Sequence, residues 1–385
     1  MNFSSIDIED SSIVKWDKRN EVFNYGQDNA YPTYIERIIN SSVTAKASAG
    51  VLSNFVYGKG FEFEFKKNEF INRKKQTPNK LLRKVSSSIS KFKGFALHIG
   101  YNALYEKSSI SLVPFKQVRW GAEDDDDYKG KVIIYDNWDK TKKKVIKKSE
   151  FNILDVYNPN PVVIQAQVDK AGGWKNYKGQ VLYVSFEESG YYPLSWIDPA
   201  IYDADSEAQS SLFKNRMLRK GFMAKTFVVT KPFDDKTDDK AKFQESLQGF
   251  LGAENNDGIL HFESELENDS LDKEVLFKDI PTKLDDKTFA HTESSVANNI
   301  RKSFLNIPPA LIDSNDSSLF GNSGESLREM RLFYQEQTDF IREEIAEVFE
   351  DVFENFRKEI NVSADWTVKK LVKEQTKELK DATDN

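Results

Sequence analysis

Two charged runs are the first places in this sequence where chemistry is possible. Glu123–Asp127 is five consecutive acids, and such residues bind Ca²⁺ when they stand at alternate positions around a glycine turn with a distal glutamate. That spacing is missing, so we interpret the run as the solvated tip of a hairpin. Lys140–Lys148 is rich in lysine and lies between strand-like segments. We interpret it as an exposed turn facing the acidic tip rather than as a phosphate-binding patch.

The remaining candidate groups indicate structure rather than catalysis. His98 lies among apolar strand residues with no second histidine or cysteine nearby, so we expect a sheet histidine and not a metal ligand. Gly58-Lys59-Gly60 lacks the spacing of a phosphate-binding loop and is typical of a helix cap. Walker A, His-Glu-x-x-His and Gly-x-Ser-x-Gly motifs are missing, and there is no cysteine. We therefore expect no enzyme activity, no cofactor and no metal.

Length and composition bound the class of protein. The 385 residues are enough for two or three domains, and the 28 Phe and 15 Tyr can supply a sizeable core. We expect no transmembrane helix, because no apolar run reaches eighteen residues, and no signal peptide at residues 1–12. The net charge of −7 argues against a protein that grips DNA, since phosphate neutralisation needs clustered cations. It is compatible with a wall past which DNA slides.

The elements that must position any site centre on residues 295–356. The sequence predicts a first helix whose apolar residues share one side: Phe289, Val296, Ile300 and Phe304. Pro308 and Pro309 follow and are expected to end that helix, because neither can donate a backbone hydrogen bond. A second, long helix carries apolar residues at steps of three and four: Ile341, Ile345, Val348, Phe349, Val352, Phe353 and Phe356.

A polar loop separates these two helices. Residues 313–324 contain two acids, Asp313 and Asp316, no lysine or arginine, and one apolar pair, Leu319-Phe320. A loop of this length inside a compact domain is uncommon and is usually functional or disordered.

Upstream, the pattern predicts an α+β domain over residues 61–190. A helix is expected from Tyr31-Pro32 to Tyr57, with Ile35, Ile38, Ile39 and Val43 on one side, and another over Leu81–Phe92. Alternating runs predict the strands of an antiparallel or mixed sheet: Phe61–Phe65, Gly94–Ile99, Ile110–Phe115, Val132–Tyr135, Phe151–Leu154, Val162–Ile164 and Val181–Val184.

A polar helix is then expected over Pro199–Phe222. Its apolar residues are only Ile201, Ala204, Ala208 and Leu212, which is too little apolar surface for a stable isolated helix. We expect it to pack against copies of itself or to bridge domains. A strand at Thr226–Thr230, a helix at Asp238–Phe250 and a strand at Ile259–Phe262 follow.

In this order of elements the chain resembles the portal proteins of tailed bacteriophages, of the long-tailed type. The resemblance rests on Ile300-Arg-Lys-Ser-Phe304 ending a helix, Ile307-Pro-Pro-Ala-Leu311, a Ser/Asn/Gly loop, and Glu325 opening a long helix. It extends upstream to Tyr31-Pro32, Tyr57-Gly-Lys-Gly-Phe61 and Val113-Pro-Phe115, and so covers roughly residues 20 to 360.

The resemblance implies a portal-like α+β fold with seven segments. These are a mixed β wing with an N-terminal arm (1–196), a stem helix (197–222), a small α/β clip (223–284), a returning stem helix (285–305), a tunnel loop (306–323), a long amphipathic wing helix (324–360) and a tail that forms a short crown or is disordered (361–385).

The resemblance also implies a function. Twelve copies are expected to form a ring in the virion at one capsid vertex, assembled in the host cytoplasm, through which double-stranded DNA is packaged and ejected. The clip would dock the large terminase subunit and later the head–tail connector or neck protein, and the ring would contact the major capsid or scaffold protein. No membrane is expected.

Site residues follow from the same resemblance. The tunnel loop would line the DNA channel with Asp313, Ser314, Asn315, Asp316, Leu319 and Phe320, and Pro308 and Pro309 would be its hinge. Portal loops often carry lysines here, and this loop has none, which argues against a lysine grip on DNA. Five cations either project into the lumen or only cap helix C-termini, and both interpretations stay open: Arg216, Arg219, Lys220, Arg301 and Lys302.

Two other functions compete with the portal hypothesis. Another oligomeric virion adaptor, from a tail, baseplate or head-completion complex, would share the acidity and the assembly, but gives no reason for the helix–loop–helix order. A magnesium-dependent nuclease would use Asp124–Asp127, and loss of hydrolysis on mutating these residues would favour it.

Overall fold

The computed structural model describes residues 14, 16–121, 130–138, 145–187, 190–220, 222–230, 251–252, 255–263, 275–279, 286–312, 324–357, 360 and 364–372, and only the backbone of the helices and strands between 216 and 292. The chain divides into two compact units. The first combines Met1–Ala204 with Asn298–Asn385, and the second is Asp205–Ala297. The second unit is therefore an insertion in the sequence of the first.

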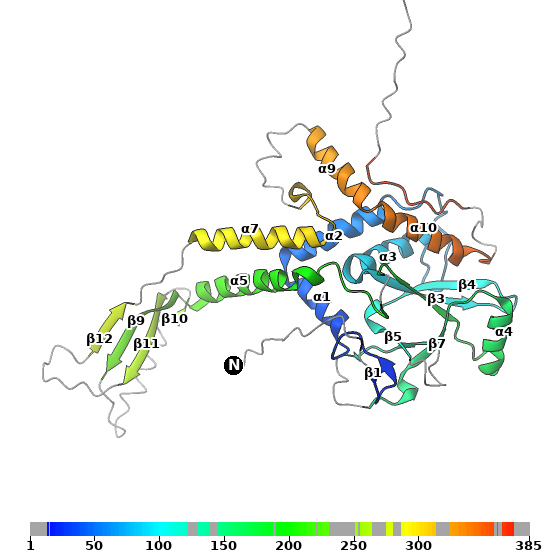
Figure 1. The fold of residues 1–385 in the computed structure, drawn as a ribbon, viewed down its shortest axis with the longest axis horizontal. Helices are drawn as coiled ribbons and strands as arrows, with labels where there is room; N and C mark the ends of the chain where they lie inside the picture. The colour runs from blue at the N-terminus through cyan, green and yellow to red at the C-terminus, as the bar shows by residue number, and fades with distance from the viewer. Residues whose placement is uncertain are drawn as a thin grey trace, which may run out of the picture. The chain divides into compact units, whose positions relative to one another are not determined.

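The first unit is built around a mixed sheet of six strands (Figure 1). Its order is β4 (Lys107–Val113), β3 (Gly94–Tyr101), β8 (Gln180–Ser185), β7 (Asn152–Val156), β6 (Lys131–Ile134) and β5 (Val118–Trp120). Neighbouring strands are antiparallel except β7 and β8. The expectation of a mixed sheet is confirmed. α3 (Pro78–Phe92) packs on β3 and β4 and buries Leu82, Val85 and Ile89.

Two helices, α1 (Tyr31–Ser41) and α2 (Val43–Tyr57), replace the single helix expected over residues 31–57. Ser42 has extended backbone, and its hydroxyl accepts a hydrogen bond from the Ala45 N–H at 2.9 Å, so it caps α2. The break turns Val43 away from the apolar stripe, and its side chain is 74% exposed. At the other end of α2, Gly58 has a φ of +56°, which confirms the expected helix cap.

Two expected strands are wrong. Val162–Ile164 lies in α4 (Pro161–Lys170), because the Asn160 side chain accepts from the Val162 N–H at 2.9 Å and Pro161 stands in the first turn. Phe61–Phe65 forms one bridge instead of a strand. Its backbone pairs with the C-terminal segment: the Glu62 N–H donates to Thr367 O at 2.7 Å.

The long wing helix is also interrupted. α9 (Gly324–Gln337) and α10 (Asp339–Phe353) are separated at Thr338. The apolar stripe is buried as expected at Ile341, Ile345, Phe349, Val352, Phe353 and Phe356, although Phe356 lies beyond the end of α10. α2 contacts both α3 and α10, so it lies between the sheet layer and this helix.

The described part of the tail, residues 364–372, packs on this core, which corrects the expectation of a crown or a disordered tail for these residues. The Trp366 ring stacks on Phe353 at 4.4 Å between centroids. The Gln335 side-chain amide donates to Val372 O at 3.0 Å and accepts from the Val372 N–H at 2.8 Å. At the other end of the chain, a hairpin joins β1 (Trp16–Asp17) to β2 (Val22–Phe23).

The second unit contains most of the helix pair and a small sheet. The helices are α5 (Ile201–Lys220) and α7 (Asp286–Ser303), close to their expected bounds. The sheet has the order β10 (Leu251–Gly252), β11 (Asn255–Glu263), β9 (Phe222–Thr230) and β12 (Val275–Asp279), with β9 and β11 parallel. Strand β12 was not expected. The helix expected at Asp238–Phe250 lies outside the described residues.

Candidate functional site: the stem base and the proline turn

Asp313, Ser314, Asn315, Asp316, Leu319 and Phe320 lie outside the described residues. Arg216, Arg219 and Lys220 stand in the last two turns of α5, where only the backbone is described. What the structure does show is how the chain enters the predicted stem, at residues 191–201, and how it leaves it, at residues 303–312.

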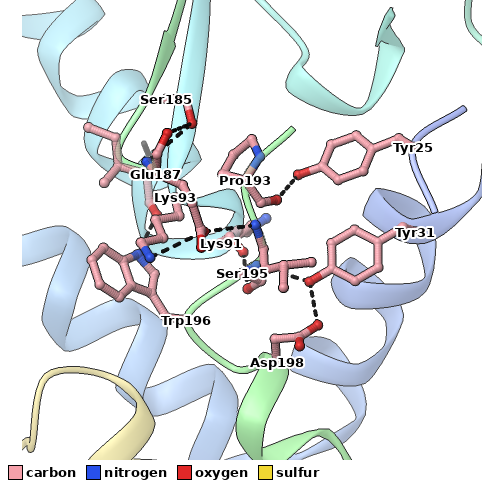
Figure 2. Close-up of polar contacts among 12 residues, drawn as sticks. Tyr25, Tyr31, Lys91, Lys93, Ser185, Glu187, Pro193, Ser195, Trp196 and Asp198 are labelled. Atoms are coloured by element: carbon pink, nitrogen blue, oxygen red, sulfur yellow. Dashed lines mark hydrogen bonds and ion pairs between the residues drawn. The ribbon is translucent and has the colours of Figure 1, made fainter. Parts of the chain in front are cut away.

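The entrance is a densely bonded segment that we call the stem base (Figure 2). The Tyr31 hydroxyl donates to the Asp198 carboxylate at 2.7 Å and accepts from the Ser195 N–H at 2.9 Å. The Ser195 hydroxyl donates to Lys91 O at 2.5 Å, and the Trp196 indole N–H donates to Ile89 O at 2.9 Å. Both carbonyls belong to the last turn of α3, so the segment is fixed to the wing just before α5 begins.

A second set of bonds holds Pro193 and Leu194, near the start of the stem base. The Glu187 carboxylate accepts from the Leu194 N–H at 3.1 Å and from Lys93 Nζ at 3.3 Å, and Lys93 Nζ also lies 5.0 Å from the Trp196 ring centroid. The Tyr25 hydroxyl donates to Pro193 O. These contacts come from Tyr25 before α1, from Tyr31 in α1, from the C-terminal end of α3 and from Glu187 just after β8. They leave the first turn of α5 little freedom to reorient.

Burial keeps the tyrosines of the stem base neutral. It raises the pKa of Tyr31 well above its ordinary value, and the charge of Asp198 raises it further. Burial likewise raises the pKa of Tyr25. Both hydroxyls therefore remain proton donors at any physiological pH.

Beyond the stem base, α5 has little apolar contact. Ile201 and Ala204 are buried, whereas Tyr202 is 66% and Leu212 is 40% exposed. α5 is joined to α7 by polar contacts: Lys214 pairs with Glu293, and the Asn299 amide donates to Asp203 at 3.4 Å. Such exposed pairs contribute little to stability. The expectation of a polar helix without enough apolar contact of its own is confirmed for its described part.

The exit from the stem differs from the expectation that the prolines end the helix. α7 stops at Ser303, and Leu305 and Asn306 adopt left-handed backbone, with φ of 60° and 55°. The Asn306 N–H donates to Lys302 O and the Ile307 N–H to Arg301 O, each at 3.1 Å. Pro308 and Pro309 come after this turn and start the short 3₁₀ helix η6 (Pro309–Leu311). They stiffen the segment entering the loop, and their hinge role stays a prediction.

The two described stem cations differ in environment. The Arg301 side chain is 8% exposed and donates to the Asn298 side-chain oxygen at 2.6 Å, so within one chain it is held against its own helix. Lys302 is exposed. Of this pair, only Lys302 is available to a ligand on the outside of the chain.

Two further residues that the sequence singled out, His98 and Lys148, have structural roles. His98 Nε2 contacts Lys178 O at 2.6 Å, which confirms a sheet histidine. Lys148, at the end of the basic run, pairs with Glu21 at 2.8 Å. The acidic run Glu123–Asp127 lies outside the described residues. Within the described ranges, no cluster of histidine and carboxylate side chains is placed to hold a metal, and no helix is long and apolar enough to cross a membrane.

Two buried arginines were missed. Arg119 and Arg342 are both buried. A signal for Arg342 exists: with Thr338, Ile341 and Ile345 it shares the apolar face of its helix, where a cation must be paired internally. Arg119 lies in a strand of only three residues, β5, and no periodic apolar pattern around it indicates burial.

Comparisons with solved structures show the fold. A chain of the virion of the native gene transfer agent (GTA) particle aligns with 90% of this chain and 84% of its own length, at 11% identity and a TM-score of 0.51. A chain of the neck of the native GTA particle, computed with C12 symmetry, aligns over 86% and 83%, at 11% identity and a TM-score of 0.49. An HK97-family phage portal protein from Corynebacterium diphtheriae aligns over 78% and 85%, at 9% identity and a TM-score of 0.38.

No protein-family model and no curated protein sequence matches the chain. The virion match, over nine-tenths of the chain, establishes that this protein shares the α+β fold of a gene transfer agent virion chain.

Proposed function

We propose that this chain is the subunit of a portal ring, a channel through which double-stranded DNA enters and leaves a phage-like particle. The observation that carries the proposal is α5: it starts at a rigid base, yet beyond the buried Ile201 and Ala204 its described part exposes Tyr202 and Leu212 and is joined to α7 by polar contacts. The fold shared with a virion chain and the resemblance to phage portal proteins support the same function.

Assembly follows from the energetics of α5. Most of the stability of a helix in a protein comes from the packing of an apolar face. Tyr202 and Leu212 are exposed within one chain, and the Lys214–Glu293 pair is half exposed on both sides. Neighbouring copies that pack α5 and α7 side by side around an axis would cover these residues. The ring is expected to contain twelve copies.

The loop after the proline turn is proposed to form the throat. Its entry is stiffened by Pro308 and Pro309, and its far end starts α9 at Gly324. Residues 313–324 contain no lysine or arginine, so a ring of these loops, lined by Asp313, Ser314, Asn315, Asp316, Leu319 and Phe320, would repel rather than hold phosphates. Transient phosphate contact would then come from Lys302 and from Arg216, Arg219 and Lys220.

The partners follow from the ring. The second unit, with its small sheet, is proposed to dock the large terminase subunit during packaging and a neck protein afterwards. The wing is proposed to contact the capsid or scaffold protein at one vertex of the particle. The ring itself would hydrolyse nothing.

Assembly can be tested with the purified chain. We expect negative-stain images of rings with a central hole, and a mass by light scattering that is a multiple of the 44.3 kDa subunit. A monomer that stays stable at micromolar concentration and above would leave the proposal without support. A ring without a through-hole would favour a different virion adaptor.

The throat can be tested separately because the chain has no cysteine. Asp316→Cys places one thiol per subunit in the loop. If the loops converge on the axis, a short bismaleimide should couple neighbouring subunits into oligomers, while Lys84→Cys on the exposed face of α3 gives the background for a wing position. Equal coupling of both variants in intact rings would contradict the throat assignment without affecting the ring.

A further inference from the structure

A cavity of about 730 Å³ in the first unit is lined by cations, hydroxyls, amides and the Phe70 ring, and by no carboxylate among the described residues. Its volume lies within the range of about 300–1,000 Å³ found for ligand sites. The cavity lies between the β3–β4 strands, the loop of residues 68–75 and the turn of residues 177–179. The cations that line it are Arg73, Lys74, Lys75, Lys178 and Arg357. In a protein with a net charge of −7, such a lining selects an anionic ligand.

The loop that carries three of these cations is rigid. Asn72 is buried, and its side-chain oxygen accepts from the Lys74 N–H at 3.0 Å and the Gln76 N–H at 3.4 Å. Its side-chain amide donates to Ile110 O on β4 at 2.8 Å, and the Ile110 N–H donates to Ile71 O at 3.0 Å. The loop therefore covers the edge of the sheet and fixes the backbone from which Arg73, Lys74 and Lys75 project.

This arrangement has a conformational and an electrostatic cost. Lys75 adopts left-handed backbone with a φ of 54°, a conformation that is unfavourable for a residue with a side chain. Three consecutive cations also repel one another. Strained backbone that the surrounding structure holds in place is typical of binding sites.

The floor and the opposite wall are fixed as well. Small side chains on facing strands, Gly100 on β3 with Ser109 and Ser111 on β4, leave the hollow above the sheet. Gly179 has a φ of 86°, and a Cβ there would lie 2.2 Å from Ile99 O, so the turn packs directly on β3 and presents Lys178. On a third side, Arg357 donates to Phe70 O at 3.1 Å.

The loop and turn cations are exposed and available to a ligand. Arg73, Lys74, Lys75 and Lys178 are exposed, and none of them pairs with a carboxylate in the part of the chain that the structure describes. Four such charges exceed what a single small anion would neutralise, and they lie on opposite sides of one hollow.

We propose that this cavity binds an acidic peptide segment of a partner protein, with carboxylates paired to the loop and turn cations and backbone groups bonded to Ser109 and Ser111. A DNA duplex is less suitable, since specific protein–DNA interfaces extend over about 1,000–2,500 Å². Single strands need exposed aromatic platforms, whereas Tyr101 and Tyr177 are half-buried and their hydroxyls donate to Gln180 and Gln167 at 2.8 Å. The site does not depend on the portal ring.

The test uses the full chain and a fluorescein-labelled hexaglutamate peptide, with binding followed by anisotropy. Lys74→Glu/Lys75→Glu replaces two attractions by two repulsions, and we expect it to raise Kd about tenfold or more. Lys80→Glu/Lys84→Glu, a matched pair of exposed positions on α3 outside the cavity, should leave Kd unchanged. Affinity should fall as salt is raised.

Cross-linking tests independently where on the protein the peptide binds. A carbodiimide, which couples carboxylates to amines, should attach the peptide to Lys74, Lys75 or Lys178 and not to Lys80 or Lys84, as mapped by mass spectrometry. Equal Kd values for the two double variants would overturn the proposal. So would tighter binding of a hexathymidylate oligonucleotide to the same cations, or displacement of the peptide by millimolar inorganic phosphate, which would indicate a nucleic-acid site and a small-anion site respectively.

Discussion

At the scale of single residues, buried arginines satisfy backbone carbonyls at the ends of elements. Arg342 donates to Phe55 O at 2.9 Å near the end of α2 and to Gln335 O at 2.7 Å near the end of α9, and it pairs with Asp339. Arg119 donates to Val118 O and Asn29 O at 2.7 and 2.8 Å. Burial lowers the pKa of Arg119 to about 10, so it remains charged at neutral pH.

Arg342 is therefore predicted to be critical for stability. Arg342→Met leaves the buried Phe55 and Gln335 carbonyls without this donor and leaves Asp339 only its contact with Lys370 at 3.6 Å, which should lower the free energy of unfolding by about 3 kcal/mol. Arg342→Lys should recover only part of the loss, because an ammonium lacks the planar fork that reaches both helix ends. Arg331→Met, at an exposed position of α9, is the control in urea denaturation. An unfolding midpoint of Arg342→Met equal to that of Arg331→Met contradicts this role.

A pH dependence is predicted for Glu36. Burial alone would raise the pKa of its carboxyl group, but hydrogen bonds and charges from Lys116 at 2.9 Å and Lys91 at 3.3 Å outweigh it and lower the pKa below 4.5. Because the folded pKa is depressed, the stabilisation is present above about pH 4.5 and is lost as the pH falls through the folded pKa. Wild type and Glu36→Gln should differ in melting temperature at pH 7 and converge in acid. Glu344→Gln, at an exposed position of α10, should show no such convergence.

At the scale of elements, the turn after α7 sets the direction in which the chain enters the tunnel loop. Asn306 is exposed and has a φ of 55°, so its contribution is almost entirely conformational. Asparagine tolerates left-handed backbone, whereas a β-branched residue does not.

Asn306→Val should therefore lower the free energy of unfolding by about 1–2 kcal/mol, whereas Asn306→Gly should be neutral or slightly stabilising. Thermal melting of the two variants measures the difference. Equal loss in both would show that the side chain of Asn306 matters and the backbone conformation does not.

Periodicity located the helices at Leu81–Phe92 and Pro199–Phe222 and five of the six strands of the sheet, because these depend on local spacing, whereas β5 was not expected. It missed the breaks at Ser42 and Thr338, where a polar residue interrupts an otherwise continuous pattern. It also assigned Val162–Ile164 to a strand from β-branched composition, although the Asn160-Pro161 start signal favoured a helix.

The candidate site was less predictable than the fold. The Tyr31–Asp198 bond joins residues 167 positions apart, and a single sequence gives no spacing rule for such a contact. The basic loop at Arg73–Lys75 carries no local signal that Asn72 fixes it to β4. A break after α7 was predicted from Pro308 and Pro309, but the turn itself is made by Leu305 and Asn306, whose left-handed backbone the sequence did not indicate.

At the scale of the whole molecule, exposed apolar side chains on α5 should be covered only in the assembly. Leu212→Glu places a charge where a neighbouring copy is expected to pack, while costing the single chain little, because surface substitutions usually change stability by less than about 0.5 kcal/mol. The mutant should therefore keep its circular dichroism spectrum and lose most of the ring fraction in light scattering. Ser211→Glu adds the same charge one residue away, about 100° around the helix, and should retain more rings. If Leu212→Glu assembles as wild type does, this part of α5 faces solvent or the lumen, and the contacts that hold the ring together must come from other elements.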